Sequence, residues 1–115
     1  MTHPHLQKIL SELHTGLVAI YGDQLDDVIL FGSQAREDAA QDSDIDIMVV
    51  LHGDEEPSID QPLADDLFYK LCWDYDTVVL PIYVSSHTYQ TMNSPLMMNV
   101  RREGRIHAIN YITAD

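Results

Sequence analysis

The chain has 115 residues, 45% of them hydrophobic, with a formal net charge of −13, so its size predicts a single domain over residues 1–115. That acidic balance argues against direct polynucleotide binding, which needs basic side chains to neutralise phosphates, and favours a basic protein partner. One cysteine, Cys72, excludes an internal disulfide, and the absence of a signal peptide or a long apolar run predicts a cytoplasmic protein that does not enter a membrane.

The first half of the chain predicts a helix followed by two strands. Residues 4–21 form one apolar helical stripe that Gly22 ends and that should cover a sheet; its members are Leu6, Ile9, Leu10, Leu13, Leu17 and Ile20. Residues 26–31 predict the first strand, and a glycine turn and a short helical or looped excursion follow. Residues 45–51 are apolar after Asp46, as in a central strand.

The second half predicts a helix, a third strand and two further helices. Ser58 or Asp60 should cap the first helix, in which leucine recurs every four residues, at Leu63, Leu67 and Leu71. Residues 77–84 are rich in β-branched side chains, and Pro81 places this strand at an edge of the sheet or at a bulge.

Serines start the last two predicted helices. Ser85 and Ser86 can cap a short helix around residues 87–89, and Ser94 with Pro95 starts another that Gly104 ends. Residues 105–115 carry no clear signal. The pattern predicts an α+β fold with a small mixed sheet of about three to five strands, flanked by helices.

Two carboxylates open the second predicted strand. Asp44 and Asp46 are two residues apart, so both should project from one side of the strand, with Ile45 and Ile47 on the other. Two close carboxylates repel each other unless a cation lies between them, and Mg²⁺ prefers oxygen ligands. The pair therefore predicts a magnesium site.

A phosphate-binding turn precedes the carboxylates. Gly32 lets the backbone approach a ligand closely, and the free N–H groups of the turn, with the Ser33 hydroxyl, can donate to phosphates. Arg36 follows three residues later, where its guanidinium could reach a triphosphate. Together the two halves predict a metal-bound nucleoside triphosphate as the ligand.

Gly32-Ser33, ten further residues and then Asp44-x-Asp46 resemble the signature of the polymerase-β-like nucleotidyltransferase superfamily. The run from Ser94 to Gly104 is similar to the ending of its smallest members, the minimal nucleotidyltransferases. The resemblance implies the polymerase-β-like fold, Mg²⁺ and ATP. It also implies a third metal-binding acid from the third strand, for which Asp76 is the preferred candidate; Val78 or Leu80 could instead occupy that position, which would leave the site with two acids.

The same resemblance implies a function and a partner. Minimal nucleotidyltransferases of this kind act as antitoxins in type VII-like toxin–antitoxin pairs, in which they transfer AMP from ATP to a tyrosine hydroxyl of a HEPN-family ribonuclease toxin. On this expectation the chain is a protein adenylyltransferase, with Asp44, Asp46 and Asp76 as catalytic and metal-binding residues and with Gly32, Ser33 and Arg36 binding the nucleotide.

Other interpretations stay open. Glu37 stands where the family commonly has glycine, and together with the unassigned third acid it allows a non-catalytic module that neutralises its partner by contact. A nucleotidyltransferase acting on a small molecule such as an aminoglycoside is a further alternative, which the lack of a second domain disfavours. The acidic residues could also form only a solvated strand edge that discourages aggregation.

Overall fold

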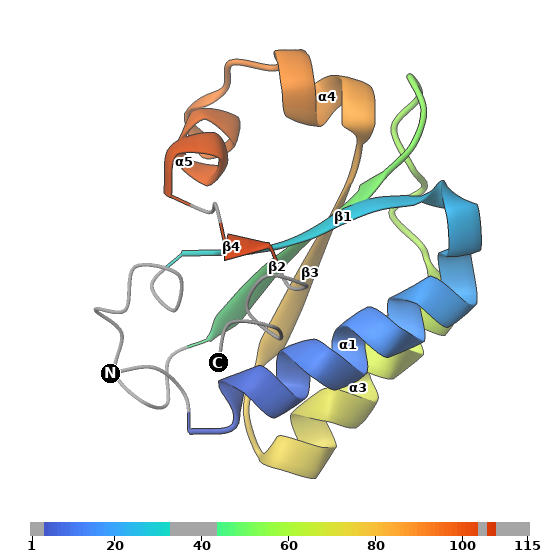
Figure 1. Cartoon of the computed structure of the whole chain (residues 1–115), viewed down its shortest axis with the longest axis vertical. Helices are drawn as coiled ribbons and strands as arrows, with labels where there is room; N and C mark the ends of the chain where they lie inside the picture. Colours follow the sequence, from blue (N-terminus) through green and yellow to red (C-terminus); the bar gives the residue numbers. More distant parts are fainter. Residues whose placement is uncertain (1–3, 33–43, 104–105, 108–115) are drawn as a thin grey trace.

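The computed structural model describes residues 4–32, 44–103 and 106–107, which contain a four-stranded sheet of order β3-β2-β1-β4 (Figure 1). β1 (Leu25–Phe31) runs antiparallel to β2 (Ile45–Leu51) and to the short β4 (Ile106–His107). β3 (Val79–Ser85) runs parallel to β2. The predicted mixed sheet, with the second strand in its centre, is therefore confirmed.

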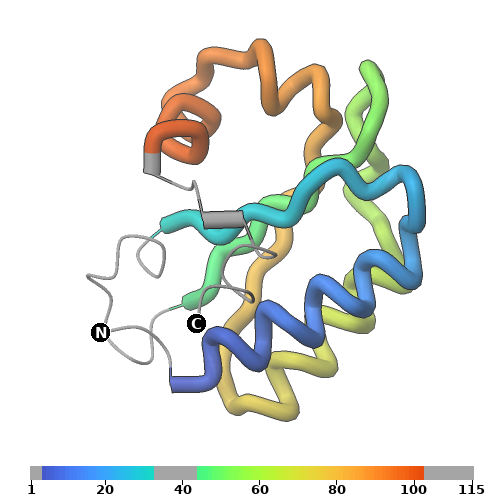
Figure 2. Tube along the Cα trace, in the orientation of Figure 1, coloured from blue at the N-terminus to red at the C-terminus, as the bar shows by residue number. Residues whose placement is uncertain are grey.

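Two helices lie side by side on one face of the sheet. They are α1 (Leu6–Tyr21) and α3 (Pro62–Tyr75), and their course along the sheet can be followed in Figure 2. The predicted stripe of α1 is confirmed, since five of its six members are buried and Ile20 packs against them. These side chains form one core with alternate residues of the strands, among them Ile45, Ile47 and Val49.

The opposite face of the sheet is covered by a shorter helix. Met97 and Val100 of α5 (Pro95–Glu103) are buried against Ile29, Met48 and Val50. This second core is smaller than the first, and it does not include Leu80 of β3, which is 44% exposed. No helix in the described ranges is both long enough and apolar enough to cross a membrane.

The predicted serine caps of the last two helices are confirmed. Ser85 Oγ accepts a hydrogen bond from the backbone N–H of Thr88, at 3.0 Å, and starts α4 (Ser86–Thr91). Ser94 Oγ accepts from the backbone N–H of Met97, at 3.2 Å, and starts α5. Each serine satisfies a backbone donor that the first helical turn would otherwise leave unpaired.

The prediction for α3 is wrong in its cap and for one of its three leucines. The N-cap is Gln61 and not Ser58 or Asp60. Leu71 is buried and Leu67 packs against the main core, but Leu63 is 69% exposed, and the other buried residues of the helix are Ala64 and Phe68. A strict repeat of four drifts by about 40° at each step around a helix of 3.6 residues per turn, so alternating offsets of four and three follow the sheet better.

The strand order accounts for Pro81 and for a fourth strand. Pro81 lies in β3, which forms one edge of the described sheet, so the predicted edge position is confirmed. β4 forms the other edge of the described sheet, next to β1, and it was not predicted because a two-residue strand is too short to show periodicity.

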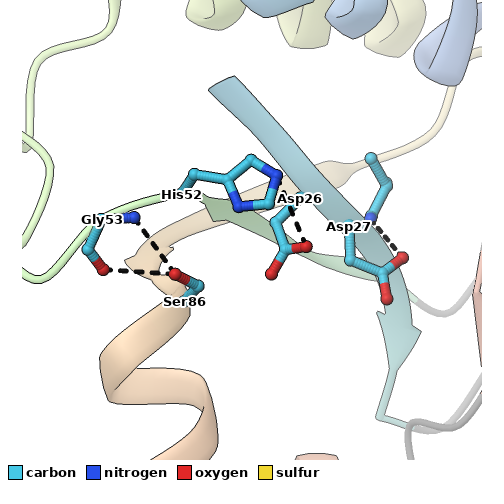
Figure 3. Close-up of polar contacts among 6 residues, drawn as sticks. Asp26, Asp27, His52, Gly53 and Ser86 are labelled. Atoms are coloured by element: carbon cyan, nitrogen blue, oxygen red, sulfur yellow. Dashed lines mark hydrogen bonds and ion pairs between the residues drawn. The ribbon is translucent and has the colours of Figure 1, made fainter. Parts of the chain in front are cut away.

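Polar contacts tie together the end of the sheet where β2 finishes (Figure 3). Ser86 Oγ lies 3.1 Å from the Gly53 nitrogen and 3.2 Å from its carbonyl oxygen. His52 Nε2 lies 3.7 Å from Asp26 Oδ1. These contacts join the loop after β2 to α4 and β1, at the end of the sheet opposite Asp44 and Asp46.

Leu71→Ala should lower the free energy of unfolding by about 2–5 kcal/mol, because it leaves a cavity in the main core. Leu63→Ala, on the same helix, should change it by less than about 0.5 kcal/mol because Leu63 is exposed. Urea denaturation of both variants measures the difference. A larger loss for Leu63→Ala would show that the orientation of α3 is wrong.

Candidate active site

The glycine turn and the second carboxylate meet where β1 ends and β2 begins. The antiparallel register places Phe31 opposite Asp46, so Gly32 lies beside the Asp46 side chain. Gly32 has a φ of 75°, and a Cβ built on it would lie 2.4 Å from Asp46 Oδ2. Only glycine therefore leaves room for this carboxylate without a shift of the surrounding atoms.

The two faces of β2 separate the carboxylate from the main core. Ile45 and Ile47 are fully buried under α1 and α3, whereas Asp46 is half-buried and alternates with them toward the other face. The predicted opposition of Asp46 and its isoleucine neighbours is confirmed. Asp44 is exposed and directly precedes the strand.

Burial raises the pKa of the Asp46 carboxyl above its ordinary value, and the nearby charge of Asp44 raises it further. Both effects make the ionised form of Asp46 unfavourable, and a cation between the two carboxylates would offset them. The ligand atoms are carboxylate oxygens, which suit a hard divalent ion such as Mg²⁺. The chemistry of this pair therefore fits the metal that the sequence predicts.

Asp76 is held by a helix end and not by a strand. It is the exposed C-cap of α3, in a left-handed conformation with φ 49°. Within the residues that the structure describes, no three His, Cys, Asp or Glu side chains come together as a metal-binding group. Among the described residues, the pair of Asp44 and Asp46 therefore has no third acidic side chain grouped with it. The role of Asp76 as a metal ligand stays a prediction.

The neighbour of Asp46 on β3 is apolar. Leu80 lies in register with Asp46 in the parallel pair, and it is 44% exposed. Register partners of neighbouring strands project from the same face, so Leu80 stands beside the carboxylate on the accessible face of the sheet. This arrangement keeps open the alternative that Leu80 occupies the third-acid position.

Two predicted nucleotide-binding residues, Ser33 and Arg36, lie outside the described residues. The contact between Gly32 and Asp46 was not predicted from the sequence, which indicated only phosphate binding for Gly32. The contact joins two strands and depends on their register, which no local pattern in the sequence specifies.

Comparisons with known proteins identify a family model and a relative that match most of the chain. Residues 7–107 match the family model of the nucleotidyltransferase domain. The chain is 35% identical over 101 residues to MJ0604 of Methanocaldococcus jannaschii, a candidate protein adenylyltransferase by name; the match covers 87% of this chain and 95% of that protein.

Solved structures share the fold. A toxin–antitoxin complex solved with AMP-PNP contains a chain that superposes with a TM-score of 0.58 at 20% identity, over 89% of this chain and 71% of that one. A candidate nucleotidyltransferase from Sulfolobus solfataricus superposes with a TM-score of 0.52 at 25% identity, over 75% of this chain and 72% of that one.

Gly32→Ala should lower the free energy of unfolding by about 1 kcal/mol or more, because alanine is strained at positive φ and its Cβ would collide with Asp46. The displaced carboxylate should also bind Mg²⁺ more weakly, which isothermal titration measures. Gly53→Ala is a matched control, since Gly53 also has positive φ but a Cβ there meets nothing within 4 Å. Equal Mg²⁺ affinity in the two variants would contradict the contact.

Asp46→Asn should make the chain more stable at neutral pH when no divalent ion is present. The folded-state pKa of Asp46 is raised, so its stabilising contribution is full below the unfolded pKa of about 3.9 and is lost as pH rises through the folded pKa. The asparagine variant avoids that loss, and its advantage should therefore disappear in acid. Urea denaturation across this pH range tests the sign; a variant less stable at neutral pH would contradict the raised pKa.

Proposed function

Because the chain belongs to the nucleotidyltransferase domain family, we propose that it transfers AMP from ATP to a hydroxyl group of a partner protein and releases pyrophosphate. The observation that carries the proposal is the pairing of Asp44 and Asp46 beside the Gly32 turn. MJ0604, to which most of the chain is similar, is a candidate protein adenylyltransferase by name, which supports a protein as the acceptor.

Asp44 and Asp46 would hold Mg²⁺, with Asp76 as a further proposed ligand. When bound, Mg²⁺ supplies charge neutralisation at the triphosphate and at the departing pyrophosphate. Gly32, with Ser33 and Arg36, would bind the phosphates of ATP.

The acceptor oxygen forms a bond to the α-phosphorus, and the bond from that phosphorus to the oxygen bridging to the β-phosphate breaks. The hydroxyl proton would pass to a carboxylate, either Asp76 or Asp46, while pyrophosphate leaves with the electron pair of the broken bond.

The partner in this proposal is a HEPN-family toxin, and the acceptor group is a tyrosine hydroxyl. One observation supports a toxin, since the fold matches a chain of a toxin–antitoxin complex. That complex was solved with AMP-PNP, which supports an adenine nucleotide as the second ligand. The charge of −13 also suits a basic partner. On this proposal the chain is the antitoxin of a type VII-like pair, and it acts in the cytoplasm, where ATP and Mg²⁺ are supplied.

Asp44→Asn and Asp46→Asn should each lower AMP transfer at least about 100-fold, because either change removes a charged metal ligand worth several kcal/mol in the transition state. The measurement is transfer of label from α-labelled ATP to the partner toxin. Asp54→Asn is the matched control, since Asp54 is exposed in the loop at the other end of β2. Unchanged labelling by the two site variants would overturn the assignment.

A second candidate function is a binding module that neutralises its partner without transferring AMP. The apolar Leu80 beside Asp46 favours it, as does the lack of a third acid grouped with the pair in the described ranges. Purified protein that binds Mg-ATP, inhibits the toxin and leaves it unlabelled would support this candidate. Leu80→Asp tests whether the lack of a third acid is the reason for the missing activity. If it is, the added carboxylate beside Asp46 should create or increase AMP labelling of the toxin.

A further inference from the structure

Asp46 has an apolar neighbour on each side within the sheet. β2 lies between β1 and β3 (Figure 1), and the two registers place Phe31 of β1 and Leu80 of β3 beside Asp46. Register partners on neighbouring strands project from the same face, so these three side chains form a row across the sheet. Phe31 packs against the second core, whereas Leu80 is 44% exposed. One flank of the carboxylate is therefore an uncovered apolar side chain.

Leu80 belongs to an apolar stripe along one face of β3. Val84, Ile82 and Leu80 are alternate residues of the strand and share this face, and Val78 continues the stripe just before the strand. Val84 is buried in the second core and Ile82 packs against it, but Leu80 and Val78 are 44% and 45% exposed. The Val78 carbonyl oxygen accepts a hydrogen bond from the Ile45 N–H at 2.9 Å. The uncovered end of the stripe is thus held beside the start of β2, where the candidate site lies.

The position of the Gly32 turn indicates which reactant meets Leu80. A Cβ on Gly32 would lie 2.4 Å from Asp46 Oδ2, so the turn borders this carboxylate from the β1 side. Under the proposed function, the turn binds the phosphates that leave as pyrophosphate. The attacking and leaving oxygens of such a transfer are roughly in line, on opposite sides of the phosphorus. With the leaving group on the β1 side, the acceptor oxygen approaches from the β3 side, where Leu80 is exposed.

An apolar wall of Leu80 and Val78 on this side favours one kind of hydroxyl group. Serine and threonine carry the hydroxyl on a short side chain, so their polar backbone would lie against the wall and lose contact with water. Tyrosine carries the hydroxyl on a large ring whose apolar body can cover the wall while its oxygen stays polar and reaches the carboxylates. The burial of apolar surface between ring and wall is favourable. The wall therefore suits a phenolic acceptor.

We infer that the wall of Leu80 and Val78 receives the aromatic ring of the acceptor side chain and selects tyrosine over serine and threonine. This inference rests on the proposed transfer of AMP, and it adds the residues that determine which side chain is modified. In the step itself the phenolic oxygen bonds to the α-phosphorus and its proton passes to a carboxylate of the site. The bond from that phosphorus to the bridging oxygen breaks, and pyrophosphate leaves with its electron pair.

Binding of a reaction product tests the contact without requiring any transfer. The two probes are short glycine peptides that contain one tyrosine or one serine, each with AMP joined to its hydroxyl oxygen. Both are titrated into the whole chain by calorimetry in the presence of Mg²⁺. The tyrosine conjugate should bind about tenfold more tightly than the serine conjugate, which corresponds to about 1.4 kcal/mol. Equal affinities for the two conjugates would overturn the inference.

Variants at Leu80 locate the preference. Leu80→Ala should remove most of it, whereas Leu80→Met should retain it because methionine keeps an apolar side chain of similar volume. Leu63→Ala is the matched control, since Leu63 is an exposed leucine, at 69%, on α3, which covers the opposite face of the sheet. Circular dichroism establishes that the three variants are folded. AMP alone should bind equally to all of them; weaker AMP binding by Leu80→Ala would assign the wall to the nucleoside and overturn the inference.

The wall and the transfer can fail separately. A chain that leaves the toxin unlabelled but keeps a preference for the tyrosine conjugate that depends on Leu80 would refute the proposed transfer and support the wall. In a chain that labels the toxin, Leu80→Ala should lower kcat/KM for the toxin about tenfold and leave KM for ATP unchanged. Labelling of the toxin with the same kcat/KM by Leu80→Ala and by the unaltered chain would refute the wall and keep the transfer.

Discussion

The pairing of β1 with β2 is the interaction on which the candidate site depends. Its register sets Phe31 opposite Asp46 and thereby brings the Gly32 turn against the carboxylate. The fit is close, because a Cβ on Gly32 would lie 2.4 Å from Asp46 Oδ2. A slip of one residue in this register would turn Asp46 into the main core and Ile45 or Ile47 out of it. The packing of the isoleucines under α1 and α3 therefore also holds the carboxylate in place.

Because helices cover the two faces of the sheet unequally, the Asp46 side chain is partly buried but remains accessible to a ligand. α1 and α3 cover one face, whereas α5 covers only part of the other, over Ile29, Met48 and Val50. Asp46 lies at the margin of that second core, so it is partly desolvated and its pKa is raised by burial and by Asp44. The molecule carries this electrostatic cost in its folded state, which is common where a charged group serves a ligand rather than stability.

Edge strand β3 contributes to both faces of the sheet. Leu80 lies in register with Asp46 and is 44% exposed beside that carboxylate. Its neighbour Val79 lies in register with Ile45 and is buried in the main core with α1 and α3. β3 therefore holds the sheet against the helices and also borders the candidate site.

The sequence by itself determined the element types, the mixed sheet, the edge position of Pro81, the serine caps of α4 and α5, and the pairing of Asp44 with Asp46. Each follows from a local pattern of period, capping or spacing. Tertiary structure alone decided the exposure of Leu63 on α3, the strand β4, and the contact of Gly32 with Asp46. These features depend on strand register and on the packing of segments far apart in the chain, and local sequence does not encode either one.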